Sequence, residues 1–168
     1  MLPFTPVTDP VEALKSTFRR HASGVAVITT VDAEGKPVGF TATSMTSLGA
    51  TPPLLTFNVA RGSSSWPALE LQGYVAVHTL GEEDVALAKK LAGPHEERFK
   101  EDDWENGPEG VPVFSSASSV IIGKIRQVHE VEANAIVVVD VLSGLVGAEQ
   151  GGLLYHHRSF VGIGQNLG

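Results

Sequence analysis

Cysteine is absent from the 168-residue sequence, which excludes disulfides, cysteine-ligated metals and cysteine nucleophiles. A chain without thiols suits a reducing compartment, and we expect a cytoplasmic protein. No apolar run approaches the roughly 18 residues that span a bilayer, since Ala135–Val139 is only of strand length. The N-terminal MLPFTPVTDP lacks the basic and apolar regions of a secretory signal. We therefore expect a soluble chain without a membrane partner.

Basic residues are also scarce. Lys and Arg total 12 against 19 Asp and Glu, which gives a net charge of −7, and they never cluster beyond pairs. This balance argues against a nucleic-acid partner, and it means that any bound phosphate must be held by local groups. The six histidines show no H-x-H or H-x-x-x-H spacing, so no metal site is predicted. The motifs of serine hydrolases, P-loop NTPases and Rossmann dehydrogenases are missing as well.

Turn-forming residues, in contrast, are plentiful: the sequence holds 18 Gly and 10 Pro. Frequent turns indicate many short strands. The length fits one domain, over residues 1–168, that can bury a real core. The alternation of apolar residues predicts strands at 25–31, 37–44, 54–60, 74–80, 118–132, 134–146 and 153–163. Helices are predicted from Pro10 to just before Gly24 and at 65–71 and 82–91, with a short surface helix in 95–103.

The first helix has the clearest local signals. Asp9 serves as N-cap, Pro10 occupies the first helical position and Glu12 completes a capping box. Val11, Leu14 and Phe18 recur on one face and form an apolar stripe. The many strands and few helices that follow favour a closed or nearly closed antiparallel barrel, because closure removes exposed edges. A Greek-key sandwich is the alternative from the residues alone.

The stretch 39–61 carries the strongest functional signal. Small and hydroxylated residues at 41–47 precede a Pro-Pro break and an apolar strand that ends near Asn58. Hydroxyls and closely approaching backbone N–H groups are able to hold a flat, phosphate-bearing ligand without a basic cluster. Arg61, followed by three serines and a helix start, is suited to bind the phosphate. A plain Ser/Thr-rich strand and turn, with Asn58 as a strand cap and Arg61 as a solvated charge, is the alternative.

The order of these segments resembles the flavin reductase-like, FMN-binding split-barrel family, the reductase components of two-component monooxygenases. The resemblance runs from about residue 10 to residue 163 and rests on the pieces in their order. These pieces are Phe18-Arg19-Arg20, Ser23–Thr30, Gly35–Gly39, Thr41–Ser47, Pro52-Pro53-Leu54, Arg61 with Ser63–Ser65, Arg98-Phe99, Trp104, Gly110–Val113 and Leu153–Phe160.

The resemblance implies a mainly β, Greek-key split barrel with a few short helices, forming a homodimer with the flavin near the subunit interface. It implies FMN, or alternatively FAD, as cofactor, NADH or NADPH as hydride donor, and a partner flavin-dependent monooxygenase. No catalytic acid or base of the protein is required. The implied cofactor-binding residues are Thr41, Ala42, Thr43, Ser44, Thr46, Ser47, Asn58, Ala60, Arg61, Ser63, Ser64, Ser65, Phe99 and His156.

Two of these assignments keep an alternative open. Phe99, with Arg98 and Trp104, forms either a lid over the flavin or donor, or an anchor of a surface helix to the core. His156 matches a family position near the flavin but is equally an ordinary strand histidine. On a regular strand, adjacent His156 and His157 would face opposite sides.

The sequence departs from the family at one position. Members usually carry Gly-Asp-His before the penultimate long strand, and that His is associated with the nicotinamide donor; here Glu132-Ala133-Asn134 stands instead. His129 lies five residues earlier, which on a regular strand places it on the opposite face from Asn134. We therefore expect normal flavin binding and slow reduction by NADH. The rival functions are a flavin carrier or sensor without turnover, and a dimeric β-barrel that binds another planar cofactor such as haem.

Overall fold

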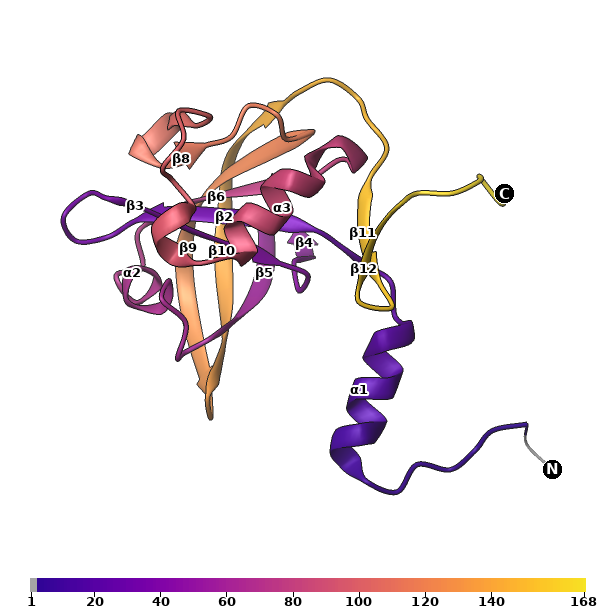
Figure 1. Ribbon diagram of the computed structural model, residues 1–168. Coiled ribbons are helices and arrows are strands. Elements are labelled where there is room, and N and C mark those ends of the chain that lie inside the picture. The colour runs from indigo at the N-terminus through magenta and orange to yellow at the C-terminus, as the bar shows by residue number, and fades with distance from the viewer. Residues whose placement is uncertain (1–2) are drawn as a thin grey trace.

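The computed structural model describes residues 3–168, so the first two residues of the expected domain and N-terminal segment lie outside it. Seven antiparallel strands form the main sheet, in the order β3-β2-β6-β9-β10-β5-β4 (Figure 1). Their bounds are β2 Ala26–Val31, β3 Pro37–Ala42, β4 Thr46–Ala50, β5 Pro53–Ala60, β6 Tyr74–Thr79, β9 Ser119–Val131 and β10 Asn134–Val146. The chain passes directly from β3, at one edge of this sheet, to β4, at the other edge. Just after β3, the Oγ of Ser44 accepts the Asn58 N–H of β5 at 2.9 Å and donates to the Asn58 carbonyl at 3.3 Å.

Smaller elements surround this sheet. A second sheet pairs β1 (Ser23–Gly24) with the hairpin of β11 (Leu153–His156) and β12 (Ser159–Gly162). A two-stranded ribbon joins β7 (Glu105–Asn106) to β8 (Pro112–Val113). The helices are α1 Pro10–Arg20, α2 Trp66–Glu70 and α3 Val85–Ala92, with single 3₁₀ turns η1 Glu82–Asp84, η2 His95–Glu97 and η3 Pro108–Gly110. The predicted mainly β class with a few short helices is confirmed.

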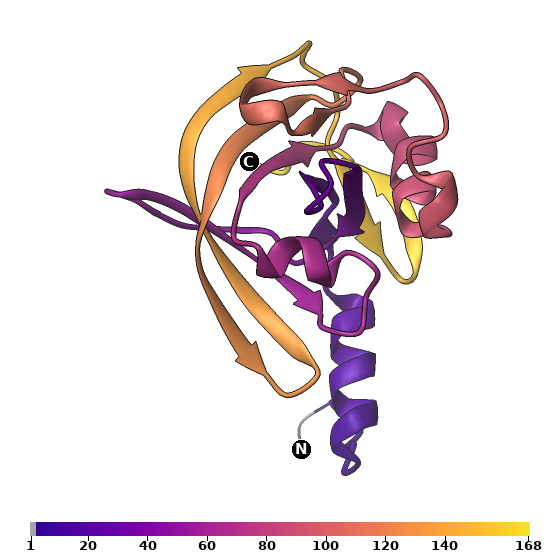
Figure 2. The same ribbon diagram turned by 90° about the vertical axis from the view of Figure 1, so that its left-hand side faces the viewer.

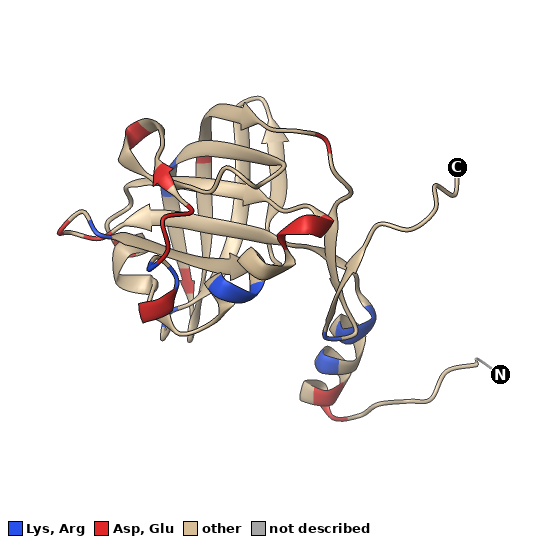
Figure 3. Ribbon diagram, turned by 45° about the horizontal axis from the view of Figure 1, so that its top comes forward, with Lys and Arg blue, Asp and Glu red and all other residues tan. Residues whose placement is uncertain are grey.

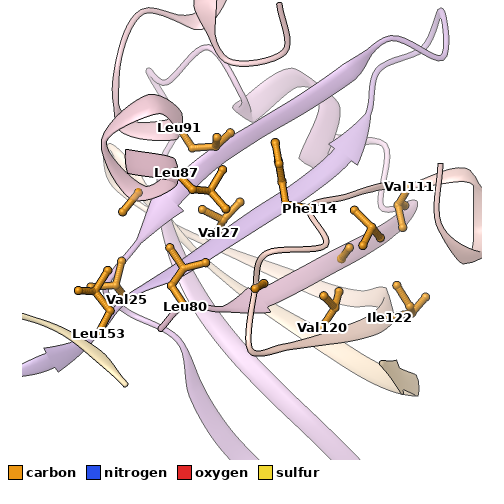
Figure 4. Close-up of a cluster of buried hydrophobic side chains, with 14 residues drawn as sticks. Val25, Val27, Leu80, Leu87, Leu91, Val111, Phe114, Val120, Ile122 and Leu153 are labelled. Carbon is orange, nitrogen blue, oxygen red and sulfur yellow. The ribbon is translucent and has the colours of Figure 1, made fainter. Parts of the chain in front are cut away.

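The core lies on both sides of β2 and β6, whose successive residues face alternate clusters. Val27 belongs to a cluster covered by α3 and the segment around Phe114 (Figure 4). Ile28, its neighbour, belongs to a second cluster that also holds Phe57 of β5 and Trp66 of α2. Gly39 on β3 is buried, and a Cβ at this position would lie only 3.0 Å from both the Ile28 carbonyl oxygen and Phe99 Cζ. This close approach lets the segment after α3 pack directly on the sheet.

The N-terminal helix follows its sequence signals but not its predicted packing. Asp9 caps α1, since its Oδ1 accepts the Glu12 N–H at 2.7 Å. The helix nevertheless projects away from the main sheet (Figures 1 and 2), and no residue of it is buried. Val11, Leu14 and Phe18 are 57%, 60% and 62% exposed. Periodicity correctly predicted an apolar stripe, which stays largely exposed within the described chain, with Phe18 at the edge of a hollow beside the β11–β12 hairpin.

Several predicted boundaries are wrong. The strand predicted at 153–163 is the β11–β12 hairpin, because His157 and Arg158 adopt positive φ values of 48° and 63° and reverse the chain. The rings of His156 and His157 therefore lie 4.3 Å apart rather than on opposite sides of a strand. Strand β4 was not predicted; all of its residues are exposed, so it carries no apolar alternation. The helix predicted at 82–91 begins as the 3₁₀ turn η1 and continues as α3.

The relation between His129 and Asn134 also differs from the sequence expectation. The β9–β10 turn lies between them, with Glu132 at a φ of 52°, so they belong to two paired strands rather than one. Asn134 pairs with Val131, and Ile136 pairs with His129. Residues paired across antiparallel strands share a face, as do residues two apart on one strand. His129 and Asn134 therefore share one face of the ribbon.

Candidate flavin site

A cavity of about 400 Å³ opens where the end of β3 meets β5 and the C-terminal end of α3. We call it the β3–β5 cavity. It is lined by Phe40, Thr41, Ala42, Thr43, Ser44, Asn58, Val59, Ala60, Ser63, Ser65, Leu91, Ala92 and Arg98. Eight of the residues predicted from the sequence are thus brought together here, although they come from two strands and the turn before α2.

Hydroxyl groups around the cavity differ in their availability. Thr41 Oγ1 donates to the Ala88 carbonyl at 2.6 Å and so ties β3 to α3. Ser44 is engaged by Asn58, as described above. Ser63 Oγ, in contrast, is buried and has no hydrogen-bond partner. A buried hydroxyl without a partner is costly and points to a missing ligand atom.

Two arginines lie close to this hydroxyl in different environments. Arg98 lines the cavity and is held by carbonyl acceptors: its Nη1 donates to Gly39 at 2.8 Å and its Nε to Gly93 at 3.0 Å. Burial lowers the pKa of its guanidinium below the ordinary value, with Glu96 acting in the opposite direction.

Arg61 does not line the cavity. Its Nη2 pairs with Glu130 at 2.8 Å and its Nη1 donates to the Glu132 carbonyl at 2.9 Å, so the β9–β10 turn holds the guanidinium. Its Nε is buried without a partner, like the hydroxyl of Ser63 two residues later. One guanidinium nitrogen of Arg61 therefore remains able to donate to an anion.

The remaining predicted residues lie elsewhere. Thr46 and Ser47 are exposed on β4. Ser64 lines only a narrow crevice with Ser65, Arg98 and Phe99. Phe99 itself packs against the core, with its ring 5.5 Å from Trp104 and 5.7 Å from Phe114, which favours the interpretation as an anchor. His156 lies on the β11–β12 hairpin, where its Nε2 faces the Arg20 carbonyl at 3.1 Å.

A larger hollow adjoins the cavity. This groove, of about 680 Å³, lies between α3 and the β11–β12 hairpin and shares Thr41, Thr43 and Ala92 with the cavity. We call it the α3–hairpin groove. Its far side is formed by Tyr155, Arg158, Ser159 and Phe160, and its α3 side by Val85 and Lys89. Sequence reasoning missed Lys89 and Arg158, because only the folded chain brings them to one groove.

The family comparison agrees with this geometry. Residues 18–164 match the family described as "Flavin reductase like domain". The chain belongs to the flavin reductase-like family. The predicted resemblance is thereby confirmed over nearly the same span of residues.

Individual members of the flavin reductase-like family resemble the chain closely. The crystal structure of a flavin reductase domain protein from Arthrobacter sp. FB24 has a TM-score of 0.89 and 45% identity, over 93% of this chain and 97% of that one. A probable flavin reductase of Rhizobium meliloti is 36% identical over 79% of this chain and 42% of its own length. An NADH:FMN oxidoreductase of Rhodococcus erythropolis is 37% identical over 74% of this chain and 65% of its own length. The chain thus spans between two fifths and two thirds of these two curated relatives.

No helix of residues 3–168 is long and apolar enough to cross a membrane. Within the same residues, no group of three or more His, Asp or Glu side chains is arranged to hold a metal ion.

Proposed function

We propose that the chain is an FMN-binding flavin reductase that passes hydride from NADH or NADPH to flavin. The unpartnered hydroxyl of Ser63, in a cavity of small and hydroxylated residues, and the unpartnered Nε of Arg61, two residues earlier, carry this proposal. Both are donors without acceptors, and a phosphate oxygen is an acceptor. The residues present therefore fit a phosphate-bearing flavin.

The chain's own residues would bind and orient the cofactor. Ser63 and Arg61 would hold the phosphate, while backbone N–H groups of Thr41–Ser47 would face the flavin edge where negative charge develops. Arg98, fixed by the Gly39 and Gly93 carbonyls, would keep the cavity wall in place. Bound flavin supplies the hydride-accepting chemistry, so no acid or base of the protein is needed. The same cavity would accept FAD with its adenylate part extending into the α3–hairpin groove.

Reductase activity is better supported than the rival functions. The Rhodococcus relative is an NADH:FMN oxidoreductase, and the groove beside the cavity offers room for a second nucleotide. Haem needs an axial ligand, and among the described residues none that lines the cavity is His, Cys, Met or Tyr. A carrier or sensor would bind FMN without turnover. Oxidation of NADH or NADPH that requires added FMN separates the reductase from both rivals, and no such oxidation would reject the proposal.

We also propose that the working form is a homodimer, as the resemblance implies. Helix α1 cannot be stable in isolation with an uncovered apolar stripe, because short helices draw their stability from packing. Separate exposed apolar residues lie on β10, where Ile136 and Leu142 are 41% and 54% exposed. A second copy of the chain would cover these surfaces with a symmetric interface.

Sedimentation should show a dimer at micromolar concentration. Charge placed on the α1 stripe by Val11→Glu with Leu14→Glu should yield a folded monomer, since two carboxylates cannot be buried unpaired. Leu167→Glu, at a position 96% exposed in the C-terminal tail, is the matched control and should stay dimeric. A wild-type monomer that still binds FMN would contradict the proposal.

The residue at position 134 should influence the rate at which the nicotinamide donor reduces the flavin. Asn134 pairs with Ala60, and Ala60 lines the cavity. Asn offers hydrogen bonds but neither a ring to stack on nicotinamide nor a positive charge. We predict that Asn134→His speeds flavin reduction by NADH at saturating FMN, measured by anaerobic stopped flow. His129 shares the same face, so His129→Ala forms the second arm of the test. Unchanged rates in both variants would show that this face does not contact the donor.

The wider context follows from the resemblance. We propose that residues 1–168 act as one flavin reductase-like domain in the cytoplasm. Reduced flavin would pass to a partner flavin-dependent monooxygenase.

A further inference from the structure

A third hollow, of about 210 Å³, lies between the last turns of α1 and the tip of the β11–β12 hairpin. We call it the α1–hairpin pocket. Three cationic side chains line it, from Lys15, Arg19 and Arg158, together with four aromatic rings, those of Phe18, Tyr155, His156 and His157. Figure 3 shows blue Lys and Arg segments on α1 and on the neighbouring hairpin.

The pocket is built by backbone contacts rather than by a chance approach of surface side chains. The His157 N–H donates to the Arg19 carbonyl at 3.0 Å, and the His156 ring faces the Arg20 carbonyl at 3.1 Å. The hairpin tip, with its left-handed His157 and Arg158, therefore closes the open C-terminal end of α1. These bonds fix the two walls of the pocket relative to each other.

The charge of the pocket is unusual for this protein. The chain carries a net charge of −7, yet no carboxylate is among the residues that line the pocket in the described structure. Four other Lys or Arg side chains have acidic partners within residues 3–168, among them Arg61 with Glu130 and Arg126 with Asp140, and the remaining ones have none. The structure gives Lys15, Arg19 and Arg158 no such pair within residues 3–168.

The dipole of α1 accounts for only part of this arrangement. Cations in a helix's last turn are favoured by its negative end, which explains Arg19 and Arg20. It does not explain Arg158, which comes from another element, nor the Arg19 Nε, which is buried with no partner. A buried guanidinium donor without an acceptor, among other cations and no anion, indicates a bound anion.

The pocket continues the nucleotide groove. Tyr155 and Arg158 line both the α1–hairpin pocket and the α3–hairpin groove, and that groove in turn opens into the β3–β5 cavity. A molecule that extends from the flavin along this path meets Lys89 and Arg158 first, and then Lys15 and Arg19. Two groups of cationic side chains thus follow one another beyond the flavin cavity, the first in the α3–hairpin groove and the second in the α1–hairpin pocket.

We propose that the α1–hairpin pocket binds the 2′-phosphate of NADPH and makes the chain favour NADPH over NADH. Both donors carry a pyrophosphate, and Lys89 and Arg158 in the groove provide enough positive charge to bind it. Only NADPH carries a further phosphate, on the adenosine ribose beyond the pyrophosphate. That dianion matches an outlying pocket with two more cations and an orphaned guanidinium nitrogen. The inference rests on the proposed reductase function.

The test removes the two cations that belong to the pocket alone, through Lys15→Gln with Arg19→Gln. The KM for NADPH should rise by about ten-fold or more, while kcat, FMN affinity and the KM for NADH stay within about two-fold of wild type. The matched control is Lys36→Gln with Lys124→Gln, which makes the same charge change at two exposed residues remote from the pocket. It should leave both KM values unchanged.

A binding measurement keeps the test independent of turnover. Wild-type protein should bind adenosine 2′,5′-bisphosphate more tightly than AMP by calorimetry, and the Lys15/Arg19 variant should lose that difference. This result without flavin reduction by either donor would reject the reductase function but support the pocket. Equal binding of both nucleotides by the wild type would overturn the assignment. Equal rises of the KM for NADH and NADPH in the variant would do the same.

Discussion

The folded protein should lose about 3 kcal/mol of stability as the pH falls from about 6.5 to about 4, because of one buried histidine. His78 on β6 is fully buried. Its Nδ1–H donates to the Val27 carbonyl at 3.0 Å, and its Nε2 accepts the Phe114 N–H at 3.1 Å. The ring is therefore neutral, and a second proton on Nε2 would oppose the Phe114 N–H.

Burial lowers the pKa of His78 from 6.5 to about 4, against opposing effects of the Val27 and Ala76 backbones and of the Asp84 carboxylate. Between these two values the unfolded chain binds a proton that the folded chain does not. Unfolding is then favoured as the pH falls, and the stability is fully present above the unfolded pKa. A shift of this size corresponds to about 3 kcal/mol.

Urea unfolding at about pH 7 and about pH 4.5 measures this loss. His78→Gln retains a donor and an acceptor but does not titrate. The free energy of unfolding of this variant should therefore depend less steeply on pH, by the slope that corresponds to about one bound proton. His129→Gln, at an exposed histidine, should keep the wild-type slope. A His78 ring that titrates by NMR near its ordinary pKa would contradict the expectation.

Arg61→Ala should raise the dissociation constant of FMN about ten-fold or more. The residue offers a buried, unpartnered Nε two positions before the unpartnered Ser63 hydroxyl, and a charge-assisted hydrogen bond to phosphate contributes about 1.5–3 kcal/mol. The loss of its ion pair with Glu130 should matter little, because both side chains are substantially exposed. Quenching of flavin fluorescence measures the affinity.

Riboflavin, which lacks the phosphate, is the internal control for this variant: its affinity should not change. Arg126→Ala removes another ion-paired arginine, remote from the cavity, and should leave FMN binding intact. The assignment of Arg61 fails if the affinities of FMN and riboflavin fall equally. It also fails if Arg98→Ala reduces FMN binding selectively while Arg61→Ala does not.

Local chemistry explains which parts of the fold could be predicted from the sequence. The Asp9 cap and the Pro10 start of α1 depend on neighbouring residues only, and the structure has both. The reversal at His157 and Arg158 could not be predicted, since neither is Gly or Asn and tertiary contact with α1 holds the turn. The uncovered stripe of α1 shows the same limit: periodicity identifies an apolar face but not what covers it.

The site shows a similar division. Thr41–Ser44 and the serines after Arg61 were recognisable because hydroxylated residues gather in short stretches. The partner of Arg61, Glu130, lies 69 positions along the chain and only the fold brings it near. Arg98 enters the cavity because two carbonyls, of Gly39 and Gly93, hold its guanidinium there. Such long-range contacts leave no local pattern in the sequence.

Anaerobic stopped-flow reduction of protein-bound FMN tests the central claim most directly. Protein saturated with FMN is mixed with NADPH or NADH, and the loss of the oxidised flavin absorbance is followed. We predict rapid bleaching that saturates with donor concentration and that is faster with NADPH. Bleaching no faster than that of free FMN with the same donors would contradict the account and leave the chain a flavin-binding protein without reductase activity.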